Sequence, residues 1–357
     1  MKIILDNIIF SLQKSGGISV YWSEIVNRIS KQKNISCSFI EEEIKNENIF
    51  RRQLEINADN LLQKNIFNFC FSRYRKINLS LKNTKFIFHS SYYRTLSKKT
   101  KKNNDVKEIV TIHDFTYEYF NSGVKKWIHS RQKREAIKAA DVVICISENT
   151  KKDLLHFFPE FNDKKIKVIY NGVSKDYFVI PKISFENIKK PYFVFVGSRS
   201  SYKNFDFAVK AVAQIKNFNL KIVGSKLSKE EITLLNCFLS GRWELLTNID
   251  NIELNVIYNN AYALLYPSAY EGFGIPLLEA MKAGCPFIAL NVSSIPEVAG
   301  KAGVLLDKLT INQFNDAIDK LNNDYQNIVE LGLIQASAFS WDKCYDEILN
   351  VYKEINN

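Results

Sequence analysis

The chain has 357 residues, which is long for one domain and sufficient for two. Hydrophobic residues make up 46%, as in ordinary globular proteins, and no stretch approaches the roughly 18 apolar residues of a membrane-spanning helix. Lysine and arginine (49) outnumber aspartate and glutamate (38), so the net charge of +11 favours nucleic acid, an anionic membrane surface or phosphorylated substrates as partners.

The cysteine spacing and the absence of known motifs limit the expected cellular setting and partners. The six cysteines are scattered without a Cys-x-x-Cys spacing, which favours a reduced, cytoplasmic setting. The apolar run within Met1–Asp6 is too short for a secretory signal. No helix-turn-helix, zinc-finger or RNP-type signature occurs, so nucleic acid is not an expected partner. A basic nucleic-acid-binding protein remains the alternative from another class.

Short apolar runs alternate with longer helical stretches through the whole chain. Continuous Val, Ile and Phe runs, rather than strict alternation, indicate strands buried on both faces of a parallel sheet. The pattern predicts an α/β protein with two doubly wound Rossmann-like domains. The expected strands are Ile3–Leu5, Ile35–Ile40, Phe86–Phe88, Glu108–Ile112, Val142–Ile146 and Lys167–Tyr170, followed by Tyr192–Val196, Leu220–Val223, Ala263–Tyr266, Pro286–Leu290 and Val304–Leu306.

The domain boundaries follow from a change of composition. We expect a first domain at residues 1–178, a second at 188–338 and a C-terminal segment at 339–357. The join falls within the polar stretch Ser174–Lys190, which contains Pro181.

Two stretches of the first domain have features of a binding surface. Gly16 and Gly17 follow the first strand, and they would let the backbone approach a ligand, although a plain tight turn is the simpler explanation. Within Glu41–Ser80, basic residues alternate with aromatic ones, and we expect helices over the first sheet. This surface would suit anionic lipid headgroups, and ordinary helix faces explain it equally well.

Histidines lie at the ends of two expected strands. His113 lies in the Thr111–Asp114 stretch at a strand end and could donate to a phosphate or a sugar hydroxyl. A buried structural side chain is the alternative. His89 is a second candidate for lining an acceptor site.

The second domain opens with a loop that carries two cations. Gly197 ends a strand, and Arg199 and Lys203 follow before the next helix. Arginine offers a two-pronged hydrogen-bond donor and lysine a point charge, so together they can neutralise a diphosphate. Surface loops often carry both residues, which is the competing explanation.

A strand, a glycine loop and a helix follow one another near Gly272. The apolar run that ends at Tyr266 is followed by Gly272 and Gly274, and Pro276 suits the first turn of a helix that ends near Gly284. Free amides and the helix dipole at this point favour an anion.

Two carboxylates bracket the predicted anion site. Glu271 stands at the mouth of the loop and Glu279 in the helix. Carboxylates repel phosphate, so they are better suited to accept hydrogen bonds from hydroxyls. A nucleotide sugar has both kinds of group, whereas a capped helix without a ligand is the structural alternative.

The stretch Tyr-Pro-Ser-x-x-Glu-Gly-Phe-Gly-Ile-Pro-x-Leu-Glu-Ala-Met-x-x-Gly resembles the signature of the retaining glycosyltransferases of family 4. The resemblance continues through Cys285-Pro286 and Ser294–Val298. Family members have the GT-B fold. The resemblance therefore implies two Rossmann-like domains facing a central cleft and a C-terminal helix that crosses back to the first domain.

The resemblance implies roles for the residues of the second domain. Glu279 would hold the nucleotide ribose, and Glu271 would act beside the donor sugar. Arg199 and Lys203 would stabilise the departing diphosphate, although Arg199 lies one position later than is common in the family. Ile249 lies where the family packs the nucleotide base. The loop residues expected to serve the sugar and diphosphate are Gly272, Phe273, Gly274 and Ile275.

Residues of the first domain receive roles in the same way. Gly17 would face the donor diphosphate, and Gly16 would lie on the acceptor side. His113 would lie near the reaction centre as a catalytic residue, with Asp114 orienting it or contacting the acceptor.

We therefore expect a retaining glycosyltransferase that transfers a hexose from a GDP- or UDP-sugar to a saccharide acceptor. The resemblance favours a lipid-linked acceptor in bacterial O-antigen, capsule or lipopolysaccharide assembly. The absence of an Asp-x-Asp motif predicts a metal-independent enzyme without a cofactor. Another GT-B enzyme, such as a nucleotide-sugar epimerase or a glucan synthase-like protein, is the nearest alternative. The expected location is cytoplasmic, with peripheral contact at the inner face of the plasma membrane left open.

Overall fold

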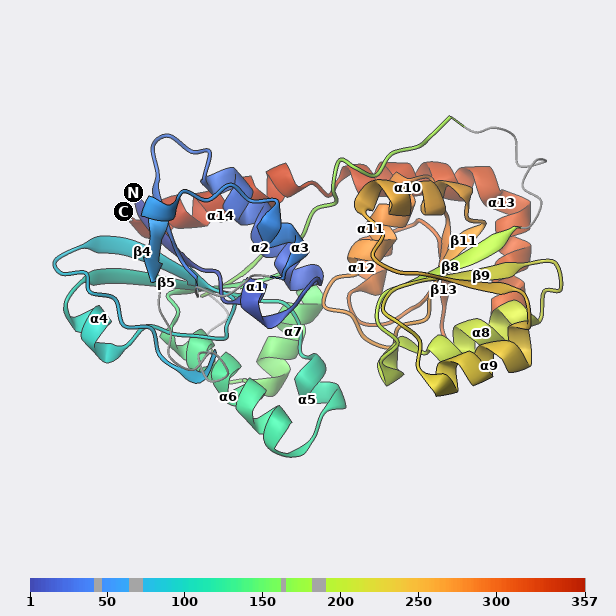
Figure 1. Cartoon of the computed structure of the whole chain (residues 1–357), viewed down its shortest axis with the longest axis horizontal. Helices are drawn as coiled ribbons and strands as arrows, with labels where there is room; N and C mark the ends of the chain where they lie inside the picture. Colours follow the sequence, from blue (N-terminus) through green and yellow to red (C-terminus); the bar gives the residue numbers. More distant parts are fainter. Residues whose placement is uncertain (42–46, 64–72, 162–164, 182–190, 357) are drawn as a thin grey trace. The chain divides into compact units, whose positions relative to one another are not determined.

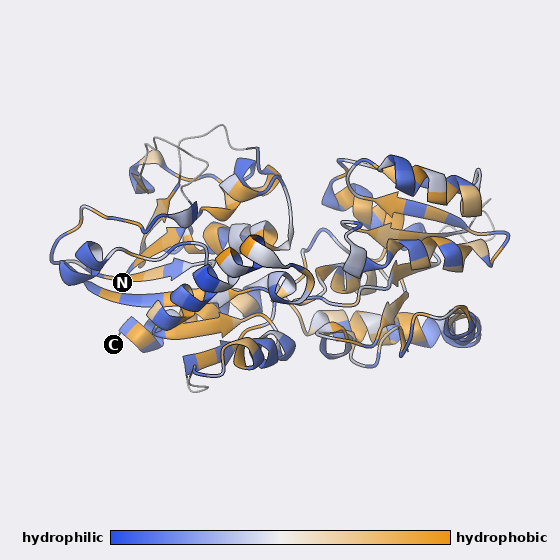
Figure 2. Ribbon diagram, turned by 90° about the horizontal axis from the view of Figure 1, so that it is seen from below, coloured by the Kyte–Doolittle hydropathy of each residue, from blue (hydrophilic) through white to orange (hydrophobic). Residues whose placement is uncertain are grey.

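The computed structural model describes residues 1–41, 47–63, 73–161, 165–181 and 191–356. The chain forms two compact units (Figure 1). Unit 1 comprises Met1–Asn171 and Trp341–Asn357, and unit 2 comprises Gly172–Ser340. In both units the strands are coloured mainly as hydrophobic in Figure 2, which agrees with a sheet buried between helices.

Unit 1 is built on a seven-stranded sheet in the order β3-β2-β1-β4-β5-β6-β7, and every ladder described in it is parallel. Its strands are β1 (Lys2–Asp6), β2 (Ser36–Ile40), β3 (Leu61–Gln63), β4 (Lys85–Ser90), β5 (Asp105–Ile112), β6 (Val142–Cys145) and β7 (Ile166–Val168). Its helices are α1 (Ile9–Leu12), α2 (Gly17–Ile29), α3 (Ile49–Arg52), η1 (Ala58–Asn60), α4 (Lys98–Lys102), α5 (Thr116–Phe120), α6 (Gly123–Ala139), α7 (Glu148–Phe157) and α14 (Trp341–Asn356).

Unit 2 is built on a six-stranded parallel sheet in the order β10-β9-β8-β11-β12-β13. Its strands are β8 (Tyr192–Val196), β9 (Asn219–Val223), β10 (Trp243–Leu246), β11 (Ala263–Tyr266), β12 (Phe287–Leu290) and β13 (Val304–Leu306). Its helices are η5 (Ser201–Lys203), α8 (Phe205–Ala213), α9 (Lys229–Leu239), α10 (Asn251–Asn260), α11 (Ile275–Lys282), α12 (Ile295–Ala299) and α13 (Ile311–Ser337).

The two doubly wound α/β units confirm the predicted fold class, and each expected strand is present. Two edge strands, β3 and β10, were not predicted. Both are short, and β10 carries the exposed Glu244, so neither forms a buried apolar run. Within the described part of Glu41–Ser80, the expected helices appear as α3, η1 and a 3-10 turn at residues 73–74, and Leu61–Gln63 forms a strand instead. Residues 42–46 and 64–72 lie outside the described part.

The C-terminal helix α14 belongs to unit 1, where it packs against α2 and β4. Arg28 of α2 donates from Nη2 to Asp342 Oδ1 over 2.8 Å. The hydroxyl of Tyr352 lies 2.6 Å from His89 Nδ1 on β4. These contacts fix the helix to the sheet of the first unit.

The segment after Asn171 already belongs to unit 2, which places the boundary earlier than the expected residue 178. Three asparagines of α10, one turn apart, bind this segment and are called the asparagine ladder below: Asn251, Asn255 and Asn259. The amides of Phe178 and Ile180 donate to Asn255 Oδ1 (3.1 Å) and Asn259 Oδ1 (2.8 Å). The asparagine side chains thus form hydrogen bonds with the backbone of this segment, as the backbone of a neighbouring strand would.

Candidate active site

Helix α11 begins after a glycine in a left-handed conformation, and its first amide points to the end of the glycine loop without a side-chain cap. Gly274 is the residue before the helix, with φ +103°, and no side chain caps the helix start. A side chain at this φ would be strained, and an added Cβ would lie 3.3 Å from Leu277 Cδ1. Pro276 in the first turn has no N–H to satisfy. The Leu277 amide donates to the Gly274 carbonyl oxygen over 3.0 Å, so the Ile275 amide, at the positive end of the helix dipole, is the one that can bind an oxyanion.

Two serines that precede α12 hold the glycine loop in shape. Ser294 Oγ donates to the carbonyl oxygens of Glu271 (2.9 Å) and Phe273 (3.0 Å), and Ser294 is fully buried. The amide of Glu271 donates to Ser293 Oγ over 2.9 Å. Sequence reasoning assigned no role to Ser293 or Ser294. The extension of the family motif through Ser294 was the available signal.

Lys203 and Glu271, predicted separately, form an ion pair. Each side chain is 13% exposed, so the pair is shielded from water on most sides. The loops that carry them are tied together, because the Ala269 amide donates to the Tyr202 carbonyl over 2.7 Å. The structure therefore brings a cation and a carboxylate together at the mouth of the glycine loop.

Asn204 adds a second tie between the same loops. Its Nδ2 donates to the carbonyl oxygen of Pro267 over 2.8 Å, and its backbone is left-handed with φ +51°. A hydrogen bond from the side chain to the start of α8 is not formed. Asn204 is therefore a brace for the Lys203 loop.

Arg199 makes contacts that differ from those expected beside a diphosphate. Its Nε donates to Glu231 Oε1 over 2.8 Å, and its Nη2 donates to the carbonyl oxygens of Ser225 (2.9 Å) and Lys226 (2.8 Å). Glu231 also belongs to the capping box of α9. Arg199 thus joins the loops after β8 and β9, and its charge is balanced by Glu231, whereas Lys203 is paired with Glu271.

Glu279 lies on α11 beside two tyrosines. The hydroxyl of Tyr258, on α10, donates to Glu279 Oε2 over 3.2 Å. Burial raises the pKa of Glu279 to about 7, and hydrogen bonds from Tyr258 and Tyr177 oppose the shift. Tyr177 comes from the segment held by the asparagine ladder. The carboxylate is therefore positioned by two hydroxyls and gains or loses its proton near neutral pH.

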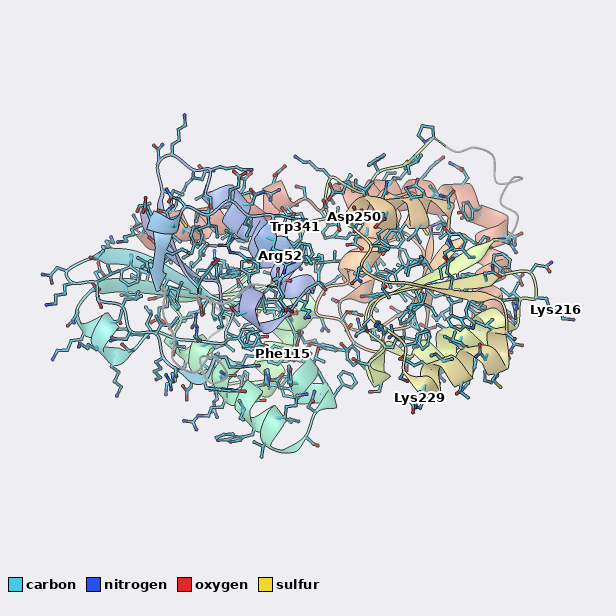
Figure 3. All side chains as sticks on the ribbon, in the orientation of Figure 1. Arg52, Phe115, Lys216, Lys229, Asp250 and Trp341 are labelled. Carbon is cyan, nitrogen blue, oxygen red and sulfur yellow. The ribbon has the colours of Figure 1, made fainter. Side chains whose placement is uncertain are left out.

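Ile249 lies in the loop between β10 and α10, and its side chain is partly buried. The parallel strands β10, β9, β8 and β11 all end at the same edge of the sheet, where ligands bind in open α/β sheets. Asp250, labelled in Figure 3, caps the following helix by accepting from the Glu253 amide over 2.8 Å. Ile249 is thus presented at the edge that carries the glycine loop.

In unit 1 the candidate residues lie after β1 and β5. Helix α2 begins at Gly17, after Gly16, without a side-chain cap. His113 is 3% exposed, its Nε2 has no partner among the described residues, and burial lowers its pKa to about 4. Its ring meets Tyr21 edge to face at 4.9 Å. His113 is thus a neutral ring with an unpaired nitrogen.

Asp114 and His89 are held by structural contacts. Asp114 Oδ1 accepts from the Thr116 amide over 2.9 Å, and its carbonyl oxygen accepts from Lys133 Nζ over 2.7 Å. His89 is fully buried, and its Nε2 lies 2.8 Å from Thr111 Oγ1. With both nitrogens of His89 paired, the expectation that it lines an acceptor site is wrong.

Within the described residues, no group of three or more His, Cys, Asp or Glu side chains is placed to hold a metal ion. No helix in the described ranges is both long and apolar enough to cross a membrane.

Known protein families match both halves of this chain. Residues 15–177 match the family described as Glycosyltransferase Family 4, and residues 176–332 match Glycosyl transferases group 1. The O-antigen chain mannosyltransferase B of Escherichia coli is 26% identical over 270 residues, which is 69% of this chain and 70% of that protein. An O-antigen chain mannosyltransferase of Salmonella typhimurium is 27% identical over 245 residues, 63% of this chain and 67% of its own length.

Solved structures share the fold. A sucrose-phosphate synthase of Thermosynechococcus elongatus matches with a TM-score of 0.76 and 16% identity, over 99% of this chain and 98% of that chain. The HepE protein of Anabaena, solved with UDP and glucose, matches with a TM-score of 0.72 and 15% identity, over 99% and 100% of the two chains. The two family models together extend over residues 15–332, and the chain belongs to the family 4 (group 1) glycosyltransferases, which have the GT-B fold.

Proposed function

We propose that this glycosyltransferase moves a hexose from a nucleoside-diphosphate sugar to a saccharide acceptor, with retention of configuration and without a metal ion. The observation that carries the proposal is the Lys203–Glu271 pair on the loop that leads into the uncapped start of α11. Lys203 and the Ile275 amide suit a diphosphate, and Glu271 and Glu279 suit the hydroxyls of the sugar and the ribose. A nucleotide sugar would use all four groups.

The proposed chemistry depends on stabilising the leaving group. The bond between the sugar C1 and the diphosphate oxygen breaks as the acceptor oxygen bonds to C1 on the same face. The acceptor hydroxyl gives its proton to the departing phosphate. Lys203 and the Ile275 amide would stabilise the negative charge that grows on the diphosphate, each charged hydrogen bond contributing about 1.5–3 kcal/mol.

The names of the relatives suggest the setting. O-antigen mannosyltransferases in two bacteria support a sugar acceptor that belongs to a surface polysaccharide, and we propose GDP- or UDP-sugars as donors.

The outer side of α5 and α6 suggests how such an enzyme would reach a lipid-linked acceptor. Phe120, Val124 and Trp127 are 43%, 73% and 59% exposed. Lys125 lies among them, and the Arg131 guanidinium lies 5.3 Å from the centre of the Trp127 ring. Exposed aromatic and basic residues on two consecutive helices favour an anionic membrane surface. We propose peripheral contact with such a membrane through this surface.

Vesicle sedimentation tests the membrane contact. We expect binding to vesicles that contain anionic lipid, weaker binding to zwitterionic ones, and a marked loss in Trp127→Ser. Equal binding of Trp127→Ser and the native protein would rule out this surface.

Thermal stability against UDP, GDP, ADP, CMP and TDP, with and without EDTA, tests the donor site. A ligand at 100 times its dissociation constant stabilises by about 2.7 kcal/mol. We expect one diphosphate to raise the melting temperature equally in EDTA. A shift lost in EDTA would contradict metal independence, and no shift with any nucleotide would overturn the proposed donor class.

A further inference from the structure

A cluster of polar and aromatic side chains in unit 1, called the Arg73 cluster below, has no part in the site described so far. It consists of Arg73, Tyr93, Tyr117, His129 and Gln132. The Nη2 of Arg73 lies 3.1 Å from His129 Nε2, and Gln132 Nε2 donates to the carbonyl oxygens of Arg73 (2.7 Å) and Tyr93 (3.1 Å). The Tyr117 ring stacks on His129 with a centroid distance of 3.4 Å. Direct contacts thus join all five residues.

The tautomer of His129 follows from its partner. Arginine stays protonated, so Arg73 Nη2 must donate and His129 Nε2 must accept. Burial, together with the charge of Arg73, lowers the pKa of His129 to about 4, so the ring is neutral and its proton is on Nδ1. His129 is 5% exposed, and Nδ1 has no partner among the described residues. This N–H is therefore a buried donor without an acceptor.

Gln132 and Arg73 add two more unpaired atoms. Because Gln132 Nε2 donates to two carbonyl oxygens, the amide orientation is fixed, and Oε1 is left as an acceptor without a donor. Arg73 Nε is likewise unpaired. Of the nine buried side-chain atoms without a partner in the described ranges, three belong to this cluster. Such atoms are rare in native proteins, and a concentration of them indicates a missing partner.

The surroundings indicate the chemistry of that partner. The charge of Arg73 is not balanced by an ion pair with any described carboxylate, and Lys125 Nζ lies 5.6 Å from the centre of the Tyr117 ring. The Tyr93 and Tyr117 rings are partly exposed, and the Tyr74 ring is 49% exposed. Two N–H donors, one of them cationic, suit an oxyanion. Aromatic faces beside polar groups suit a small organic ligand such as a sugar.

The cluster adjoins the end of β5, the edge of the sheet where ligands bind in such folds. Lys133, one residue after Gln132, donates to the Asp114 carbonyl oxygen over 2.7 Å. Its ammonium also lies 4.2 Å from the centre of the Phe115 ring, labelled in Figure 3. The Asp114 carboxylate, which accepts from the Thr116 amide, is close enough to influence His129.

We propose that the Arg73 cluster binds the oxyanion of an acidic saccharide, which is a phosphate or a carboxylate carried on a sugar. Arg73 Nε–H and His129 Nδ1–H would donate to the oxyanion, and Gln132 Oε1 would accept from a sugar hydroxyl. The half-exposed Tyr74 ring is the group that would move to admit the sugar. That this saccharide is part of the acceptor rests on the proposed function; the binding site itself does not.

Calorimetric titration of the full chain with four probes tests the site: glucose 1-phosphate, glucuronate, glucose and inorganic phosphate. Arg73→Lys keeps the charge and removes the planar donor, and His129→Phe keeps the stacked ring and removes both nitrogens. We expect each variant to bind the acidic sugars about 10- to 100-fold more weakly. Arg75→Gln, an exposed neighbour, is the matched control and should bind normally.

Each outcome decides a part of the proposal. Preference for glucose 1-phosphate identifies a phosphosugar, and preference for glucuronate identifies a uronic acid. Equal binding of glucose or of inorganic phosphate would overturn the acidic saccharide. Unchanged binding in both Arg73→Lys and His129→Phe, or loss only in Lys203→Ala, would place the oxyanion elsewhere. Stabilisation by nucleotides, measured on the same variants, reports separately on the proposed donor site.

Discussion

The candidate site residues of the two units differ in how their polar groups are paired. In unit 2, Lys203 is paired with Glu271 and Arg199 with Glu231, and serines and an asparagine tie the loops together. The exception in unit 2 is Arg199 Nη1, which has no partner among the described residues. In unit 1, His113 and His129 are buried, neutral and left with an unpaired nitrogen. Charges that are paired in advance can exchange partners with a charged ligand at little cost of reorganisation. Unpaired neutral groups gain most from a ligand that supplies the missing hydrogen bonds.

Of the variants considered, Lys203→Ala should reduce turnover the most. It removes the charge that would stabilise the departing diphosphate and leaves Glu271 unpaired. We expect kcat to fall about 10²–10³-fold, as for the loss of one preorganised donor. Lys210→Ala, which removes an exposed partner of Asp206, is the control and should retain full activity. Steady-state kinetics decide the point: an equal loss in both variants would remove Lys203 from the chemistry.

Glu279→Gln should weaken nucleotide binding about tenfold, because a ribose hydroxyl would lose a charged acceptor. Since burial raises the pKa of Glu279 to about 7, the carboxylate is largely protonated at pH 6 and ionised at pH 8. Nucleotide affinity should therefore rise with pH across this window in the native protein and stay flat in Glu279→Gln. Calorimetry at several pH values measures both. A native affinity that does not change with pH would contradict the ribose assignment.

Arg199→Ala should act on stability more than on binding. It leaves Glu231 and two carbonyl oxygens without their donor, so the free energy of unfolding should fall by about 1–3 kcal/mol. Lys216→Ala on the same unit (labelled in Figure 3) should change stability little. Urea unfolding and nucleotide titration separate the two effects. If nucleotide affinity fell as far as in Lys203→Ala, the ligand would have to recruit Arg199 from its present contacts.

His113→Phe should have the smallest effect. It keeps an aromatic ring against Tyr21 and removes the unpaired ring nitrogen, so turnover should fall about three- to tenfold. Nucleotide affinity should change little, because the ribose and base are assigned to residues of unit 2 and the unit 1 residue expected at the diphosphate is Gly17, not His113. Kinetics and calorimetry on this variant test whether unit 1 contributes to turnover without contributing to nucleotide affinity. Full activity would leave His113 as a packing residue.

The glycine loop could be predicted from sequence because its chemistry is local: strand, glycines and helix start are consecutive residues. The same holds for strands buried on both faces. The partner of Arg199 is Glu231, which is distant in sequence and lies on another helix, so spacing alone could not show that its charge is balanced there. The edge strands β3 and β10 were missed because half-exposed strands lack a continuous apolar run.

The candidate sites of unit 1 were less predictable, because their residues are also distant in sequence. His113 could be identified at a strand end, but the Arg73 cluster combines residues from separate segments without a common motif. Its aromatic and basic residues looked like ordinary helix faces. Only the hydrogen-bond pattern distinguishes an unpaired nitrogen from a satisfied one.

The asparagine ladder has a practical consequence for dissecting the protein. A fragment of unit 2 that began at residue 188, where the composition changes, would lack Phe178 and Ile180 and leave the side chains of the ladder without these backbone partners. It would also lose Tyr177, one of the two hydroxyls beside Glu279. A fragment that begins at Gly172 and ends at Ser340 keeps both, and it should fold and bind nucleotide as an independent piece.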